Sequence, residues 1–222
     1  MRAIALLGGP KEEWPHNLAT EIKEASKKGD LIMASDRGSL FLLELGIVPD
    51  VALGDYDSLT FDEREIVESK VKDMRYSNPI KDFTDSEMLF YAAFIDYRVD
   101  SLTVYGATGG RMDHFFVNMY AMLKAPFDRF KEKIKFIDKQ NIIHFFGKGK
   151  HILPYEADYK YLGIGTLTGA KNFSIKNARY DLQSIDLPVP TVYSSNEYLN
   201  RQAIEISCES GTLIVINSRD KK

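Results

Sequence analysis

Short apolar runs alternate with segments of helical periodicity in the first part of the chain. The apolar runs predict buried strands, at residues 3–9, 31–35, 51–53 and 101–106. Apolar residues that recur every three or four positions predict helices between them, at residues 12–28, 39–45, 63–69, 84–96 and 114–123. Strands that alternate with helices usually form a mainly parallel sheet with helices on both faces. This part of the sequence therefore predicts a Rossmann-like α/β N-terminal domain, residues 1–132.

The pattern changes to strands and turns from about residue 133. Apolar or alternating runs, separated by Gly, Pro and Asn, predict strands, at residues 133–138, 141–146, 160–167, 202–208 and 212–218. Ser210 and Gly211 lie between the last two runs and predict a β-hairpin there. We therefore expect an all-β sandwich C-terminal domain, residues 133–222.

The composition is that of an ordinary folded protein. Of the 222 residues, 44% are hydrophobic and 27% are charged, which excludes a disordered chain. The net charge of −3 argues against a general nucleic-acid-binding protein, since such proteins are usually basic. The single cysteine, Cys208, excludes an internal disulfide and a multi-cysteine zinc site. No apolar run is long enough for a membrane span or a signal-peptide core, so we expect a cytoplasmic protein.

Four polar clusters lie at or beyond the ends of the predicted strands of the first domain. An open parallel sheet binds its ligands beyond the carboxyl ends of its strands, so these clusters are the first places to look for chemistry. They comprise residues 35–38, 54–58, 81–85 and 106–114.

Asp55 and Asp57 form the most informative pair. They lie two residues apart, directly after Gly54 and a predicted strand. In an extended segment such side chains point to the same side, where their charges repel unless a cation lies between them. Carboxylates of this kind, together with substrate phosphates, suit Mg²⁺. The alternative is a turn with two solvated aspartates.

The next cluster adds Lys81, Asp82 and Asp85. Thr84 followed by Glu87 three residues later fits a capping box at the start of the predicted helix. A helix cap and a ligand site are compatible roles for neighbouring residues, so both interpretations stay open here.

The last cluster, GATGGRMDH, is a glycine-rich turn between a strand and a helix. Backbone N–H groups in such a turn can approach phosphate oxygens, and a helix N-terminus favours anions. Arg111 adds a bidentate phosphate donor. The turn matches neither the Walker pattern nor the dinucleotide fingerprint. His114 is either an acid or base in the chemistry or simply a residue at the helix start.

Together the clusters bring six acidic and three basic residues to one predicted rim: Asp36, Asp55, Asp57, Asp82, Asp85 and Asp113, with Arg37, Lys81 and Arg111. Carboxylates that hold a metal, beside cations and a glycine turn that hold phosphate, indicate phosphoryl transfer. Bound Mg²⁺ would reverse the local charge, so an acidic protein can still bind ATP at such a rim.

The motifs ASDRG, GDYDS, KDFTDSE and GATGGRMDH, in this order, resemble those of the thiamin pyrophosphokinase family. The resemblance continues through GTLTGAKNFSIKNARYDL and SSNEYL, and so covers nearly the whole chain. It implies transfer of the pyrophosphoryl group of ATP to the hydroxyl of thiamin, giving thiamin diphosphate and AMP. It also implies a requirement for Mg²⁺ and a homodimer whose active site lies at the subunit cleft.

The resemblance also implies roles for individual residues. It gives Asp55, Asp57 and Asp85 as magnesium ligands, and these three together with Asp82 as catalytic residues. It assigns ATP binding to Asp36, Arg37, Gly38, Lys81, Thr108, Gly109, Gly110, Arg111, Asp113 and His114. It assigns thiamin binding to Ser195 and Asn196.

Two positions depart from the family pattern. Tyr56 stands where phenylalanine is usual. Eukaryotic members stack thiamin on a late tryptophan, whereas the only tryptophan here is Trp14. If stacking occurs, we therefore expect it from another aromatic side chain such as Tyr193 or Tyr198.

The mechanism that follows is an in-line attack of the thiamin hydroxyl on the β-phosphorus of ATP, with AMP as the leaving group. Asp57 or Asp85 would accept the proton, and the sequence does not choose between them. Two other functions fit the same carboxylates. One is a Mg²⁺-dependent nucleotide pyrophosphohydrolase, and the other is a thiamin or nucleotide sensor without catalysis.

Overall fold

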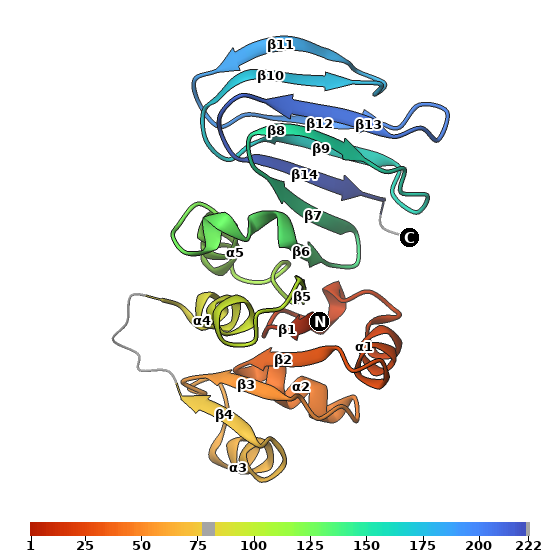
Figure 1. Ribbon diagram of the computed structural model, residues 1–222. Helices are drawn as coiled ribbons and strands as arrows, with labels where there is room; N and C mark the ends of the chain where they lie inside the picture. The colour runs from red at the N-terminus through yellow and green to blue at the C-terminus, as the bar shows by residue number, and fades with distance from the viewer. Residues whose placement is uncertain (77–82, 221–222) are drawn as a thin grey trace. The chain divides into compact units, whose positions relative to one another are not determined.

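The computed structural model describes residues 1–76 and 83–220. The chain divides into two compact units, residues 1–139 and 140–222, which we call the first and second units (Figure 1). Each unit is described by itself.

The first unit is built on a parallel sheet. Among the described residues its strands run in the order β6-β5-β1-β2-β3-β4, and every pairing between them is parallel. The strands are β1 (Arg2–Leu6), β2 (Leu31–Ser35), β3 (Val51–Gly54), β4 (Asp73–Tyr76), β5 (Ser101–Tyr105) and β6 (Ile134–Ile137). The α-helices are α1 (Leu18–Lys27), α2 (Arg37–Glu44), α3 (Phe61–Lys70), α4 (Asp85–Tyr91) and α5 (Met112–Ala121). The short helices are η1 (Lys11–Glu13), the π-helical η2 (Ala92–Asp96), η3 (Phe127–Arg129) and η4 (Lys131–Lys133).

Strand β2 lies inside this sheet, and all five of its residues are buried. Ile32 and Ala34 pack into a cluster with Leu18 and Ile22 of α1. Since side chains alternate between the faces of a strand, the burial of the remaining residues of β2 means that both faces are covered. This explains why its sequence, LIMAS, is continuously apolar until its last residue.

The second unit contains two antiparallel sheets, with strand orders β12-β9-β14-β7 and β11-β10-β13-β8 in the described residues. Their strands are β7 (Asn141–Phe146), β8 (Gly149–Leu153), β9 (Tyr161–Thr166), β10 (Ala170–Lys176), β11 (Leu182–Leu187), β12 (Val192–Glu197), β13 (Ile204–Cys208) and β14 (Leu213–Ser218). Ile164 and Val215 from one sheet and Phe173 and Ile206 from the other share one buried cluster. The inner faces of the two sheets therefore form a common core.

The sequence prediction of a strand–helix half and a strand-only half is confirmed, but its boundary needs a correction. Residues 133–139 were assigned to the second domain, whereas they belong to the first unit. There β6 pairs in parallel with β5 and extends the sheet. A strand that follows only short helical turns has the same sequence pattern as the first strand of an all-β region. For this reason the pattern places the boundary before β6 rather than after it.

The predicted hairpin at Ser210 and Gly211 is wrong. Strand β13 pairs with β8 and β10, while β14 pairs with β7 and β9. The two residues therefore connect one sheet to the other. Gly211 has a φ of +113°, and a Cβ there would lie 2.7 Å from the carbonyl oxygen of Gly169, so glycine serves this crossing rather than a hairpin turn.

The remaining corrections concern element ends and elements that the pattern did not predict. Helix α1 begins at Leu18 rather than at residue 12, and the predicted helix 84–96 is α4 followed by η2. Strands β4, β8, β10, β11 and β12 were not predicted. Their sequences are rich in polar residues, since at least one face of each is exposed or half-exposed.

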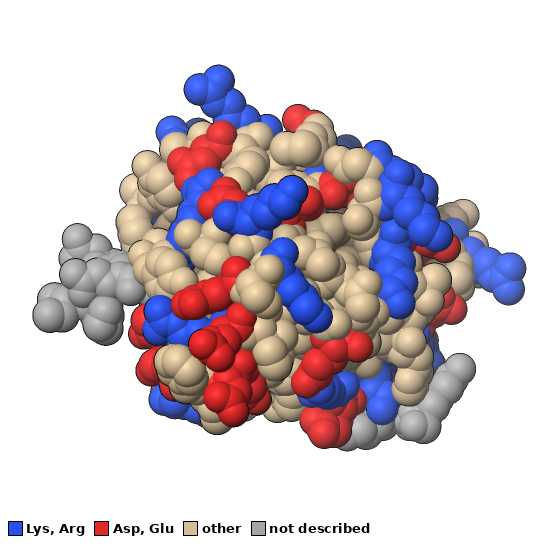
Figure 2. All heavy atoms as spheres, turned by 90° about the horizontal axis from the view of Figure 1, so that it is seen from below, with Lys and Arg blue, Asp and Glu red and all other residues tan. Residues whose placement is uncertain are grey.

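Surface and helix properties agree with the composition. Figure 2 shows Lys and Arg side chains interspersed with Asp and Glu on the face seen there. None of the helices in the described part of the chain has both the length and the apolar character of a membrane span. Cys208 lies buried in β13.

Candidate active site

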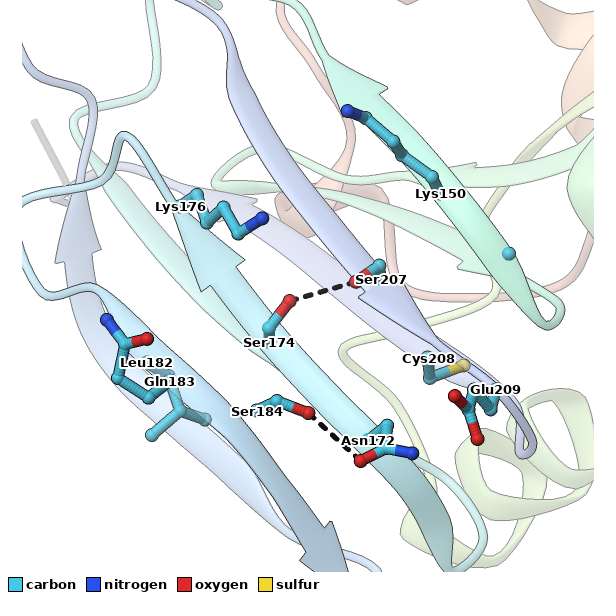
Figure 3. Close-up of a pocket in the computed structure, with 11 residues that line it drawn as sticks. Lys150, Asn172, Ser174, Lys176, Leu182, Gln183, Ser184, Ser207, Cys208 and Glu209 are labelled. Atoms are coloured by element: carbon cyan, nitrogen blue, oxygen red, sulfur yellow. Dashed lines mark hydrogen bonds between the residues drawn. The ribbon is translucent and has the colours of Figure 1, made fainter.

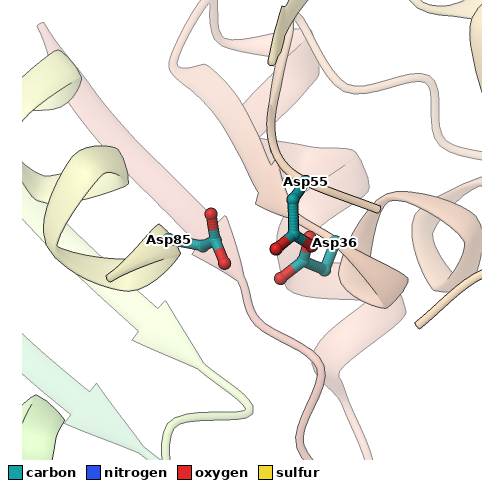
Figure 4. Close-up of side chains that lie close together, drawn as sticks. All are labelled: Asp36, Asp55 and Asp85. Carbon is teal, nitrogen blue, oxygen red and sulfur yellow. The ribbon is translucent and has the colours of Figure 1, made fainter. Parts of the chain in front are cut away.

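Three carboxylates meet at the carboxyl end of the parallel sheet (Figure 4). Asp36 follows β2, Asp55 follows β3, and Asp85 is the first residue of α4. Each offers an oxygen atom, and these atoms all lie within 4.8 Å of one another. We call this group the carboxylate cluster.

The register of the strands brings Asp36 and Asp55 together. Ser35 of β2 is the partner of Leu53 in β3, so the residues that follow the two strands emerge side by side. Asp36 has a φ of 45°, which turns the chain sharply out of β2. A Cβ on Gly54 would lie 2.0 Å from Oδ1 of Asp36. Only glycine at position 54 leaves room for the Asp36 carboxylate.

The cluster is electrostatically unfavourable without a cation. Burial, and next the charge of Asp85, raise the pKa of the Asp36 carboxyl from 3.8 to about 7. The backbone N–H of Tyr56 donates to Oδ1 of Asp36 at 3.1 Å and partly offsets this rise. A cation among the three carboxylates would remove the repulsion.

Asp57 lies beside the cluster rather than in it. Tyr56 has a φ of 59°, so the segment from 55 to 57 is not extended, yet the Asp57 carboxyl stays close enough to that of Asp55 for the two side chains to interact. The backbone N–H of Asp57 donates to Oδ1 of Asp55 at 3.0 Å. Asp57 is exposed, and the nearby charge of Asp55 raises the pKa of its carboxyl.

The donor set of the cluster fits a hard divalent cation. It consists of carboxylate oxygens only, which suit Mg²⁺, Ca²⁺ or Mn²⁺ rather than a metal that prefers nitrogen or sulfur. Asp36, which the sequence suggested only for ATP binding, is a member of this set. Lys81 and Asp82 lie outside the residues that the structure describes.

The predicted capping box at α4 is confirmed. The Thr84 hydroxyl accepts from the Glu87 N–H, and the Glu87 carboxylate accepts from the Thr84 N–H. The box fixes the first turn of α4 and therefore the residue that begins it, Asp85.

Arg37 and Gly38, both predicted to bind ATP, have structural partners. Arg37 lies 3.4 Å from Glu63 and donates to the backbone carbonyl of Ser58. A Cβ on Gly38 would lie 2.2 Å from the carbonyl oxygen of Leu6, so glycine lets α2 approach β1. These contacts join the start of α2 to the elements around the cluster.

A second glycine turn lies against the predicted one. The N–H of Gly9, just beyond β1, donates to the carbonyl of Gly106 at 3.1 Å, and a Cβ on Gly9 would collide with that carbonyl. Strand order reverses between β1 and β5, which makes this the topological switch point where open sheets bind ligands. The sequence reasoning missed Gly8 and Gly9, although a Gly-Gly pair directly after a buried strand was the available signal.

The turn after β5 is held from both sides. Thr108 donates to the buried Asp138 at 2.6 Å, and the Asn118 amide donates to the Ala107 carbonyl at 3.1 Å. Gly109 has a φ of +80°, and Gly110 is exposed beside it. The hydroxyl of Thr108 therefore has a structural partner, while the exposed end of the turn is accessible to a ligand.

Arg111, Asp113 and His114 are exposed at the start of α5. Arg111 and Asp113 form a two-bond ion pair, with bonds of 3.1 and 2.5 Å. The His114 N–H donates to Asp113, consistent with the helix-start interpretation.

In the second unit, the predicted residues Ser195 and Asn196 differ in character. The register of β12 shifts between Tyr193 and Asn196, and Ser195 has a φ of 61° and is exposed. Such a bulge redirects a side chain. Asn196 is buried, and its amide accepts from the Tyr180 N–H at 3.0 Å and donates to the Tyr180 carbonyl at 2.8 Å. Asn196 therefore holds the backbone of Tyr180.

The aromatic side chains suggested by the sequence are partly buried. Tyr193 stacks on Phe173 at a centroid distance of 6.3 Å, and the Tyr198 hydroxyl donates to the buried Asn217 at 3.1 Å. By contrast, the Tyr180 side chain is 57% exposed. Nothing in the sequence pattern singles out Tyr180, because the hydrogen bonds by which Asn196 holds its backbone arise only from the fold.

A polar cavity of about 560 Å³ lies on the sheet β11-β10-β13-β8 (Figure 3). Ser174 and Ser207 share a hydrogen bond of 2.8 Å in it, and Lys150 and Lys176 both pair with Glu205. It contains none of the site residues that the sequence predicted. Because both lysines already pair with Glu205 and the acidic Glu209 also lines the cavity, we assign it no ligand.

Two family models match the chain. "Thiamin pyrophosphokinase, catalytic domain" matches residues 22–136, and "Thiamin pyrophosphokinase, vitamin B1 binding domain" matches residues 150–213. A relative named thiamine pyrophosphokinase, from Bacillus subtilis strain 168, is 31% identical over 230 residues. That alignment covers 99% of this chain and all of the relative.

Solved structures agree with these matches. A thiamin pyrophosphokinase family protein from Enterococcus faecalis has a TM-score of 0.89 and 32% identity, and the thiamine pyrophosphokinase from Bacillus subtilis has a TM-score of 0.83 and 26% identity. In both cases the match covers the whole of each chain. With its carboxylate cluster and glycine turns at the sheet edge, and with matches over both units, the chain belongs to the thiamin pyrophosphokinase family.

Proposed function

We propose that this chain transfers the pyrophosphoryl group of ATP to thiamin at the carboxylate cluster, giving thiamin diphosphate and AMP. The reaction is that of its family, and the observation that supports its location is the convergence of Asp36, Asp55 and Asp85. The three carboxylates repel one another when no cation is bound. Their close arrangement becomes favourable when they bind a cation together with a nucleotide phosphate.

We propose Mg²⁺ as the cation, held by the three carboxylates of the cluster. The sequence-based set was Asp55, Asp57 and Asp85, and the geometry favours Asp36 in place of Asp57. When bound there, Mg²⁺ would neutralise charge on the phosphate oxygens of the substrate.

The nucleotide is best accommodated at the switch point between β1 and β5. Gly8, Gly109 and Gly110 are exposed and leave backbone N–H groups accessible there, while Gly9 holds the two turns together, and Arg111 supplies a cation nearby. Asp113 and His114 begin α5 beside it. These residues bind and orient the triphosphate for in-line attack.

Asp57 is the better candidate for the proton acceptor. The thiamin hydroxyl attacks the β-phosphorus and loses its proton, while the bond to AMP breaks. Asp57 is exposed and lies outside the cluster, and its pKa is raised by Asp55, which makes its carboxylate more basic. Asp85, the other candidate, is committed to the cluster.

Thiamin recognition is assigned to the second unit, in keeping with the vitamin B1 binding domain model. We propose that Ser195 and the exposed ring of Tyr180 face thiamin, since a ring that already has the Arg179 guanidinium 5.5 Å from its centroid can attract the cationic thiazolium ring in the same way. Asn196 positions both by holding the Tyr180 backbone beside the bulge. A homodimer and a cytoplasmic location, which the family resemblance implies, complete the proposal.

The first prediction separates the kinase from its alternatives. Incubation of the protein with ATP and Mg²⁺ should release AMP only when thiamin is present, because the nucleophile is the thiamin hydroxyl. The Asp55→Asn variant should lose this activity by at least about 100-fold, since one cluster ligand and its charge are lost. AMP release without thiamin would support a hydrolase, and no AMP release at all would support a sensor.

The second prediction concerns the pH dependence of stability. Because the pKa of Asp36 is about 7 in the folded protein and 3.8 as its ordinary value, the folded state binds more protons than the unfolded state between these pH values. The stability without divalent cations should therefore fall as pH rises through this window. In EDTA at pH 8, the Asp36→Asn variant should melt above the wild type, by roughly 2–4 °C for each kcal/mol of relief.

Mg²⁺ should reverse this effect. It should raise the melting temperature of the wild type more at pH 8 than at pH 6, where protons compete for Asp36, and it should not stabilise Asp36→Asn to the same extent. Equal Mg²⁺ shifts at both pH values, or a lower melting temperature for Asp36→Asn in EDTA at pH 8, would contradict the proposed cluster.

The third prediction concerns Tyr180. Tyr180→Leu should raise the KM for thiamin by roughly tenfold, because an interaction of about 1–2 kcal/mol between ring and cation is lost. The KM for ATP should stay unchanged. Tyr180→Phe keeps the ring and should retain the wild-type KM for thiamin. Steady-state AMP formation measures all three, and an unchanged KM in Tyr180→Leu would exclude this residue from the thiamin site.

A further inference from the structure

Glu87 is a buried carboxylate that no step of the proposed reaction uses. Its side chain is 1% exposed, and it lies in the first turn of α4, two residues after Asp85. A buried charge is costly unless it is paired and hydrogen-bonded. The bonds of Glu87 therefore indicate what this charge does for the structure.

Both oxygens of Glu87 are engaged, each with a different part of the first unit. Oε2 accepts from the Thr84 N–H at 2.9 Å and lies 3.2 Å from the Thr84 hydroxyl, which completes the capping box. Oε1 accepts from Nζ of Lys124 at 2.7 Å. A single carboxylate thus joins the cap of α4 to the segment that follows α5.

Lys124 is itself held in place. Its N–H donates to the Ala121 carbonyl at 3.0 Å, and its carbonyl accepts from the Asp128 N–H at 2.9 Å. Earlier in the chain, within α5, the Asn118 amide donates to the Ala107 carbonyl in the glycine turn. Through α5, the ion pair connects the helix that bears Asp85 to the turn that we assign to phosphate.

We infer that the Glu87–Lys124 ion pair is a positioning device that holds Asp85 in the carboxylate cluster and thereby sets the affinity of the cation site. The inference rests on the proposed cation site. Neither residue is one of the three cluster ligands, and both act through Thr84 and the first turn of α4.

The physical reason lies in the buried charge. Without Lys124, Oε1 of Glu87 loses its partner in a buried site, and a carboxylate that turns toward solvent leaves the Thr84 N–H that it caps. The first turn of α4 is then no longer bonded to Lys124, and Asp85, which begins this turn, is no longer held in a fixed position. Mg²⁺ requires near-ideal octahedral geometry, so its affinity is sensitive to a small displacement of one ligand.

The test is Mg²⁺ binding to the full chain without nucleotide, measured by calorimetry well below the melting temperature. Lys124→Met should bind Mg²⁺ about tenfold more weakly than the wild type, as is common for groups that orient metal ligands. It should also need more Mg²⁺ for AMP formation, with an unchanged KM for thiamin. Lys124→Arg, which keeps the charge, should restore most of the affinity.

A surface ion pair supplies the matched control. Arg64 and Glu68 pair at 2.7 Å on α3, and both side chains are about two-fifths exposed, at 43% and 39%. Arg64→Met removes a comparable cation without leaving a buried charge, and should keep the Mg²⁺ affinity of the wild type. This control separates the loss of a positive charge from the loss of positioning.

A double variant keeps the inference testable if Lys124→Met does not fold. Glu87→Gln combined with Lys124→Met leaves no buried charge and should fold, yet it should bind Mg²⁺ more weakly than the wild type because no ion pair ties α4 to the segment after α5. Wild-type Mg²⁺ affinity in either folded variant would reduce the pair to a purely structural role and overturn the inference. A wild type that binds no Mg²⁺ would instead refute the proposed cation site.

Discussion

Repulsion among Asp36, Asp55 and Asp85 is the constraint on which the first unit depends. Parallel strands end at one edge of their sheet, and the three carboxylates lie at that edge. The fold brings their oxygen atoms within 4.8 Å of one another even when no cation balances their charges. The chain must hold them there against mutual repulsion and burial, which together move the pKa of Asp36 to about 7. A cation bound among the three carboxylates removes their repulsion, so the same arrangement that is unfavourable alone favours cation binding.

Several local features stabilise the arrangement. The positive φ angles of Asp36 and Tyr56 direct one carboxylate inward and present a backbone N–H to it. Gly54 leaves the space that this carboxylate occupies. The capping box of Thr84 and Glu87 fixes the third ligand. Functional sites commonly combine such strained and repulsive elements, which a sequence chosen only for stability would avoid.

The sequence predicted the parts that depend on local chemistry. Continuous apolar runs such as LIMAS revealed the buried strands, and the spacing of Thr84 and Glu87 revealed the cap. It did not assign Asp36 to the cluster, because Asp36 meets Asp55 only through the register between β2 and β3. The sequence could not show that Asn196 is buried with its amide bonded to the Tyr180 backbone, because burial arises only from the fold. The crossing at Gly211 looked like a hairpin for the same reason: strand partners are a property of the sheet.

The most direct test of the central claim is the anomalous diffraction of crystals soaked with Mn²⁺, an ion that takes the same oxygen ligands as Mg²⁺. The account predicts one strong anomalous peak within coordinating distance of carboxylate oxygens from Asp36, Asp55 and Asp85. It also predicts that this peak is lost in crystals of Asp55→Asn. A peak elsewhere with none among these three carboxylates, or an unchanged peak in the variant, would contradict it.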